Sequence, residues 1–177
     1  KKMKMKNIIT KTGISIFVLI FMQSCVSVSM ISSISGVKQK ILTDIPKGVR
    51  IINVKKHNIS ADNLYEEVYS ILLTRGHRIF KDDQKRHYIT TEGRDIGEST
   101  LQRMIIVISE NGKDSNLKIT TEWKAGSDAT TTASAMSGIN VYSDWAIAKW
   151  EISRLGISFA ESVAIACEIN GEEITYE

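Results

Sequence analysis

Cysteine, proline and long apolar runs are all scarce in this sequence. Its 177 residues include two cysteines, Cys25 and Cys167, and one proline, Pro46. The apolar stretch at residues 14–22 would reach only ~14 Å as a helix, less than half of the ~30 Å hydrocarbon core of a bilayer. The sequence therefore argues against a long proline-rich linker and against a membrane-spanning helix in this stretch.

Excess positive charge is confined to the first residues. Residues 1–24 hold five lysines and no acid, so the remainder carries 23 − 5 = 18 basic and 20 acidic side chains. The formal charge of +3 thus comes from this leading segment. It gives no reason to expect a nucleic-acid partner.

The leading segment has the order of a bacterial export signal. A lysine-rich start precedes the apolar residues 14–22 and the small residue Ser24. The quartet Met22, Gln23, Ser24 and Cys25 resembles the lipobox of bacterial lipoproteins, which implies cleavage before Cys25 and a lipid on its sulfur. In that family Val26, rather than Asp, after the cysteine implies the outer membrane, with the protein facing the periplasm. An ordinary secretory signal is the alternative.

Three segments are expected along the chain. Residues 1–24 form the signal peptide, residues 25–46 form the lipidated cysteine and an extended tether, and residues 47–177 form one domain of ordinary size. With Cys25 lipidated, Cys167 has no disulfide partner. Its apolar neighbours predict a small, buried side chain.

Periodicity predicts the elements of the domain. A helix is expected between the cap Ser60 and the stop Gly76, and a second helix from Ser158, where Glu161 completes a capping box. Strands are expected at residues 49–54, 77–81, 86–92, 101–109 and 116–124, with a short strand at residues 174–176, whereas residues 144–154 fit neither period. The predicted core comprises Leu64, Val68, Ile71, Leu72, Ile106, Ile108, Ile119 and Trp123.

This order of elements predicts an α+β fold. We expect two layers, with a four- to five-stranded, mainly antiparallel sheet and two helices packed on one face. The order is similar to that of the helix-grip domains in accessory lipoproteins of the outer-membrane barrel-assembly machinery. A fold alone does not imply a function.

Strand 101–109 is apolar on both of its faces. Ile105 and Val107 alternate with the core residues and need cover from residues 145–152 or from a partner. Large aromatic side chains can anchor such a contact, and a basic cluster can meet an anionic surface. The candidate interaction surface comprises Ile105, Val107, Trp145, Trp150, Arg78, Lys81, Lys85 and Arg86.

Catalytic and metal sites receive little support. Residues 156–160 approach the nucleophile elbow of serine hydrolases, but all three histidines precede Ser158 and the final glycine is Ala160. His77 and His87, on opposite faces of a predicted hairpin, cannot share a metal and are expected to face solvent. No cofactor is expected.

The resulting hypothesis is a non-enzymatic, lipid-anchored domain of the cell envelope. It would bind an envelope protein or assemble with its own kind. The first alternative is a carrier of a small apolar ligand, held between the sheet and the second helix under a loop at residues 125–139. The second alternative is a hydrolase that uses Ser158.

Overall fold

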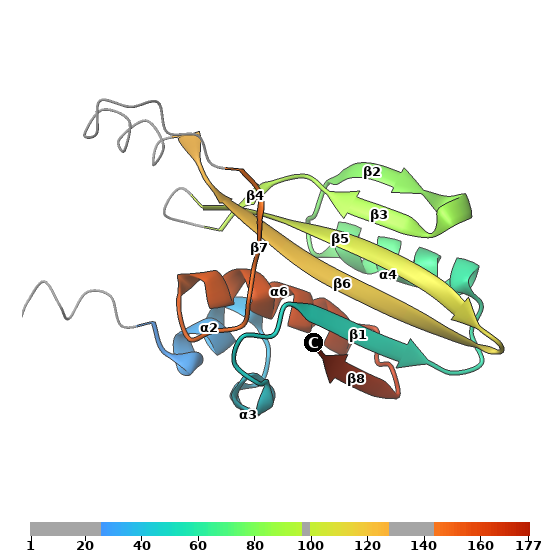
Figure 1. The fold of residues 1–177 in the computed structure, drawn as a ribbon, viewed down its shortest axis with the longest axis horizontal. Helices are drawn as coiled ribbons and strands as arrows, with labels where there is room; N and C mark the ends of the chain where they lie inside the picture. Colours follow the sequence, from blue (N-terminus) through green and yellow to red (C-terminus); the bar gives the residue numbers. More distant parts are fainter. Residues whose placement is uncertain (1–25, 97–99, 128–143) are drawn as a thin grey trace, which may run out of the picture.

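The computed structural model describes residues 26–96, 100–127 and 144–177 (Figure 1). Three expectations lie outside these residues: the signal peptide, the lipid attachment at Cys25, and most of the loop expected at residues 125–139. None of the described helices is long and apolar enough to cross a membrane.

An antiparallel sheet forms one layer of the molecule. Its main path runs β2-β3-β5-β6-β1-β8, with β4 paired to β5 and β7 paired to β6. The sheet has eight strands rather than four or five, because two-residue strands extend it and Ile174 and Tyr176 do form a terminal strand. The bounds are β1 Ile51–Lys56, β2 Ile79–Asp83, β3 Tyr88–Thr91, β4 Arg94–Asp95, β5 Thr100–Asn111, β6 Asp114–Ala125, β7 Ala146–Ile147 and β8 Glu173–Tyr176.

The long β5–β6 hairpin is the centre of the sheet. Asn111 pairs with Asp114, so the connecting loop has two residues. Its first residue, Gly112, has a φ of 70°, as a type II′ turn requires. This register fixes which side chains of both strands face the helices, because neighbouring residues in a strand point to opposite faces.

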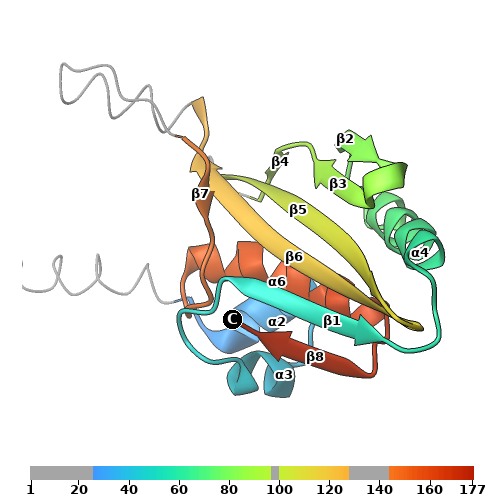
Figure 2. The same ribbon diagram turned by 45° about the vertical axis from the view of Figure 1, so that its right-hand side comes forward.

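Helices α4 (Ala61–Thr74) and α6 (Arg154–Glu168) cover one face of the sheet (Figures 1 and 2). The Ser60 hydroxyl caps α4 by accepting a hydrogen bond from Asn63 N, and Gly76 follows the helix with a φ of 78°. These features were predicted. The start of α6 was not, because the helix begins four residues before Ser158, after Ser153.

Residues expected to form a tether are helical instead. Helix α2 (Val28–Ser35) packs against α6, and the short helix α3 (Gln39–Asp44) follows it. Ile31 and Leu42 are fully buried in the same core as the sheet residues. The alternation of serine with apolar residues suggested an extended segment. In the helix, however, an apolar residue, Ile31, and a serine, Ser35, are both buried.

The core lies between the sheet and the helices. Six of the eight predicted core residues are buried: Leu64, Val68, Leu72, Ile106, Ile108 and Ile119. Ile71 is half-buried against this cluster, whereas Trp123 is half-buried near the open end of β6 and lies outside it. Cys167 is also half-buried rather than fully buried.

Candidate functional site

The face of the sheet opposite α4 and α6, here called the outer face, carries the predicted contact residues of β5. Ile105 pairs with Thr90 on one side and Thr120 on the other. Val107 pairs with Tyr88 and Lys118, and it is 40% exposed. Ile105 is half-buried, so its strand neighbours cover part of it.

Trp145 lies at one end of the outer face. The centroid of its ring is 4.3 Å from the Arg103 guanidinium carbon and 4.8 Å from Lys124 Nζ. Arg103 also pairs with Glu122 at 2.6 Å, so the indole lies over an ion pair on β5 and β6. The contact with these cations places Trp145 over Arg103, two residues before Ile105 in β5. Val107, two residues after Ile105, remains exposed.

The rest of residues 144–154 follow a different course. After the short strand β7, Trp150 turns into the core, where it is 3% exposed and packs against Phe159 with ring centroids 6.0 Å apart. The candidate surface therefore loses Trp150, which is a core residue. One of the two expected options was that this segment covers Ile105 and Val107. The structure shows no such cover for Val107, which is 40% exposed.

The predicted basic cluster is divided between the two ends of the β2–β3 hairpin. Arg78 precedes β2, beside Arg94, whereas Lys85 and Arg86 lie in the 3-10 helix η2 (Gln84–Arg86) at the tip. Lys81 is exposed within β2. The four cations are therefore spread along the hairpin, with Arg78 before the five-residue strand β2, Lys81 within it, and Lys85 and Arg86 after it.

A charged cluster that the sequence did not reveal lies where α4 ends against α6. Arg75 donates from Nε and Nη2 to the two carboxylate oxygens of Glu161, each at 3.0 Å. The buried His77 places Nε2 at 3.1 Å from Oε1 of the same carboxylate, and Arg75 also bonds to Glu168. His77 is therefore an interior residue and does not face solvent as expected.

The cluster strongly favours the ionised form of Glu161. Burial alone would raise the pKa of this carboxyl, but the hydrogen bond from His77 and the bidentate contact with Arg75 outweigh it and lower the pKa to about 2. A hollow of about 250 Å³ adjoins Glu161, Arg94 and the buried Gln102. The contacts of Glu161 with Arg75 and His77 link α6 directly to the end of α4.

The other histidines also have carboxylate partners. His87 Nε2 is 2.9 Å from Asp62 Oδ1, and His57 Nδ1 is 2.8 Å from Asp114 Oδ2. Each contact joins two segments that are far apart in the chain. Within the described ranges, no group of three or more histidine, cysteine or acidic side chains is placed to hold a metal ion.

Ser158 lacks the setting of a catalytic serine. Its side chain is completely buried inside α6, and its Oγ has no hydrogen-bond partner among the described residues. A nucleophile elbow exposes the serine at a turn between strand and helix, which is not the setting here. Ser158 is also not the helix cap that its spacing to Glu161 predicted, because α6 starts earlier.

An apolar groove lies between α3 and the segment that carries Trp150. Its volume is about 410 Å³, within the usual range for small-molecule sites. The predicted ligand position was elsewhere, between the sheet and α6, where Phe159 and Val163 are fully buried in the core. The groove is lined by Val28, Leu42, Thr43, Ile45, Lys47, Trp150, Glu151, Ile152 and Ser153.

Comparison with known proteins gives little beyond the structure itself. No family model matches the chain. No curated protein matches it either. The crystal structure of a DUF4468 family protein from Bacteroides ovatus is similar over 72% of this chain and 90% of that chain, with 10% sequence identity and a TM-score of 0.37. A likeness at this level assigns neither a fold family nor a function.

Proposed function

We propose that this chain is a non-enzymatic, lipid-anchored domain of the bacterial cell envelope that binds a protein through the outer face of its sheet. The lipid on Cys25 would hold it at the outer membrane, facing the periplasm. The bound protein would be an envelope component or a second copy of the chain.

The observation that carries this proposal is the uncovered side of β5. Val107 is 40% exposed at the middle of the sheet, while its neighbour Ile106 is fully buried under the helices. Covering a large apolar side chain completely contributes ~1.5 to 3 kcal/mol. A helix or sheet of a partner protein, packed on this face, would bury the exposed side chain of Val107 and complete the burial of Ile105.

A pair of lysine substitutions on the same strand face tests the proposal. Val107→Lys places a charge at the centre of the outer face, and Ser109→Lys places the same charge two residues further along, where Ser109 is already exposed. Envelope preparations carrying each variant would be cross-linked and the adducts identified by mass spectrometry. Sedimentation of the purified protein would detect self-association.

The expected result is a specific adduct or dimer that forms with the wild type and Ser109→Lys and is lost with Val107→Lys. Both variants should keep the wild-type midpoint of unfolding, because exposed positions tolerate substitution within ±0.5 kcal/mol. Identical adducts for all three proteins would show that the outer face is not the contact surface.

The apolar groove supports a second candidate, the carrier of a small apolar ligand. Ile152 lines the groove and is 58% exposed, whereas Ile147, in β7, is 50% exposed and is not part of the lining. An apolar dye such as N-phenylnaphthylamine should lose binding with Ile152→Asp and keep it with Ile147→Asp. Equal binding by both variants would exclude the groove as the ligand site.

A further inference from the structure

The described chain leaves almost no spacer before the folded domain. Only Val26 and Ser27 separate Cys25 from α2, and Ser27 already caps that helix by accepting a hydrogen bond from Met30 N at 3.2 Å. Two extended residues span at most ~7 Å. If Cys25 carries a lipid, as proposed above, α2 must lie close to the lipid headgroups.

Positive charge is concentrated in the segment that follows. Residues 26–50 hold four cations and one acid, a net charge of 4 − 1 = +3, whereas residues 51–177 hold 14 cations and 19 acids, a net charge of −5. All four cations are exposed, and none forms an ion pair within the described ranges. They are Lys38, Lys40, Lys47 and Arg50.

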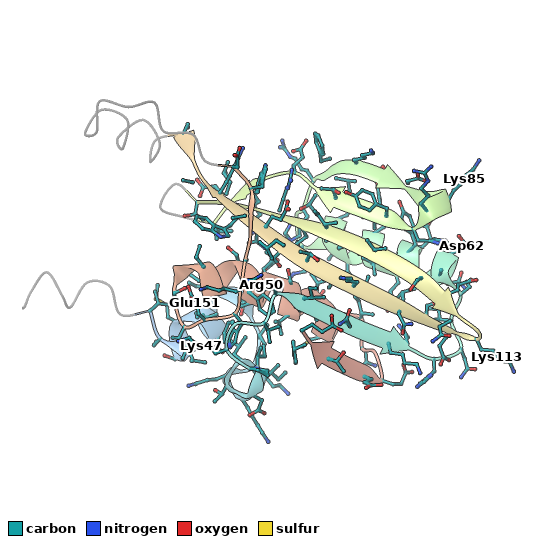
Figure 3. The ribbon with its side chains drawn as sticks, in the orientation of Figure 1. Lys47, Arg50, Asp62, Lys85, Lys113 and Glu151 are labelled. Carbon is teal, nitrogen blue, oxygen red and sulfur yellow. The ribbon has the colours of Figure 1, made fainter. Side chains whose placement is uncertain are left out.

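Lys38 precedes α3, and Lys40 lies within it. Figure 3 shows Lys47 and Arg50 in the half of the molecule that holds α2 and α3, and Lys85 and Lys113 at the opposite end. Carboxylates also lie in this region: Asp44 is in α3, Glu151 is 3.7 Å from Lys149, and Asp95 and Glu161 line the hollow that Ile34 also lines. The C-terminal residue, Glu177, lies beside the start of β1.

The exposed side of α2 adds apolar contact. Met30 and Ile34 are one helical turn apart, on one face of the helix, and are 48% and 55% exposed. Serines at positions 29 and 33 complete the exposed side without adding charge. An amphipathic helix of this kind can lie in the interface plane of a bilayer while nearby cations contact phosphate groups.

We infer that α2, α3 and the turn into β1 form a docking surface for anionic phospholipid headgroups. The lipid on Cys25 would hold the chain at the bilayer, and this surface would determine which side of the domain faces the headgroups. The domain is thereby held upright on the membrane in one orientation, with the Lys85 and Lys113 end directed away from it.

Vesicle binding by the unlipidated chain tests the docking surface separately from the anchor. A chain comprising residues 26–177 retains every described core residue. It would be sedimented with vesicles of phosphatidylcholine alone and of phosphatidylcholine with phosphatidylglycerol. The test variant is Lys47→Glu with Arg50→Glu, and the matched control is Lys85→Glu with Lys113→Glu, which changes the net charge equally.

Wild type and control should bind the phosphatidylglycerol vesicles, and the test variant should bind at least about tenfold more weakly, since each cation at an anionic surface contributes appreciably. Added salt should weaken binding, because exposed charges are screened. Equal binding to both vesicle types, or equal losses in the test and control variants, would overturn the inference.

Lysine footprinting on the full-length, membrane-bound protein separates this inference from the proposed anchor. Lys38, Lys40 and Lys47 should be protected from a water-soluble acylating reagent, while Lys85 and Lys113 stay reactive. Lipidation of Cys25 with uniform lysine reactivity would support the anchor and contradict the docking surface. Vesicle binding by residues 26–177, together with a full-length protein whose Cys25 carries no lipid, would support the surface and contradict the anchor.

Discussion

Arg75 and Glu161 form a bidentate ion pair that joins the end of α4 to α6, with both N···O distances at 3.0 Å. His77 contacts the same carboxylate, so three side chains from two segments 86 residues apart meet at one point. This pair explains why Glu161 stays ionised although much of it is buried. It also makes Glu161 the most informative residue for acid stability.

The first prediction concerns Glu161→Gln. Removing the charge leaves Arg75 and His77 without their shared carboxylate, which should lower the free energy of unfolding at pH 7 by about 2 to 4 kcal/mol. Glu168→Gln removes a more exposed partner of Arg75, so its cost should stay below about 1 kcal/mol. Denaturant titrations of both variants compare the two contacts.

The effect of Glu161→Gln on the free energy of unfolding should also depend on pH. The pKa of Glu161 is about 2 in the folded protein and ordinarily 4.5, so its contribution is complete above pH 4.5 and is lost as the pH falls toward 2. The difference in unfolding free energy between wild type and Glu161→Gln should therefore narrow across this interval. A difference that stays constant from pH 7 to pH 2.5 would contradict the assigned pairing.

The second prediction compares adjacent residues of β5 that point to opposite faces. Ile106→Ala should cost about 2 to 5 kcal/mol, because Ile106 is fully buried and its removal leaves a cavity. Val107→Ala should stay within about 0.5 kcal/mol in the isolated domain, since Val107 is already exposed. Similar losses for both variants would mean that something in the domain covers the outer face.

The third prediction compares two buried serines one turn apart on α6. Ser158 Oγ has no partner among the described residues, whereas Ser162 Oγ lies 2.5 Å from Thr121 Oγ1. Ser158→Ala removes an unsatisfied hydroxyl and should be neutral or stabilising, while Ser162→Ala should cost about 1 to 3 kcal/mol. Calorimetry of both variants gives the comparison, and a destabilised Ser158→Ala would imply a partner for this hydroxyl.

The fourth prediction concerns Gly156, inside α6. Replacing a helical glycine with alanine usually stabilises by about 1 kcal/mol. Here an added Cβ would lie 2.1 Å from the backbone oxygen of Glu151, so the substitution forces the chain to move. Gly156→Ala should therefore destabilise by about 1 to 3 kcal/mol, and an increased melting temperature would show that the turn before α6 gives way freely.

The fifth prediction tests the anchor. Mass spectrometry of the mature N-terminus should find Cys25 as the first residue and acylated, because the lysine-rich start, the apolar stretch and Ser24 precede it in the order of a lipoprotein signal. Cys25→Ala should abolish acylation. The proposed anchor fails if the mature chain begins elsewhere, or if the Cys25→Ala protein still fractionates with the membranes.

Local patterns predicted the elements whose signals lie within a few residues. Ser60 and Gly76 bracket α4, because capping geometry depends on the residues themselves. The alternation in β5 predicted correctly that Ile106 is buried. The α+β class with helices on one face of an antiparallel sheet followed from these elements.

Long-range contacts decided what local patterns could not. Helix α6 begins after Ser153, whose side chain makes no capping hydrogen bond to the helix, and Gly156 lies close to the Glu151 backbone. No capping motif in the sequence therefore marks this start. Helix α2 packs against α6, and such tertiary packing, rather than local sequence, supplies most of the stability of a short helix. The serine-rich sequence of α2 by itself therefore suggested an extended segment. Arg75 and Glu161 are 86 residues apart in the chain. The spacing of charged residues along the sequence therefore could not predict this ion pair.

Strand β1 has the latest-made strand of the sheet as one of its neighbours. Ile51 and Glu177 exchange backbone hydrogen bonds, and Val54 pairs with Ile174. During synthesis the backbone of β1 therefore emerges long before β8, and one edge of β1 stays unpaired until β8 appears. Native closure of this side of the sheet is thus a non-local event, of the kind that slows folding.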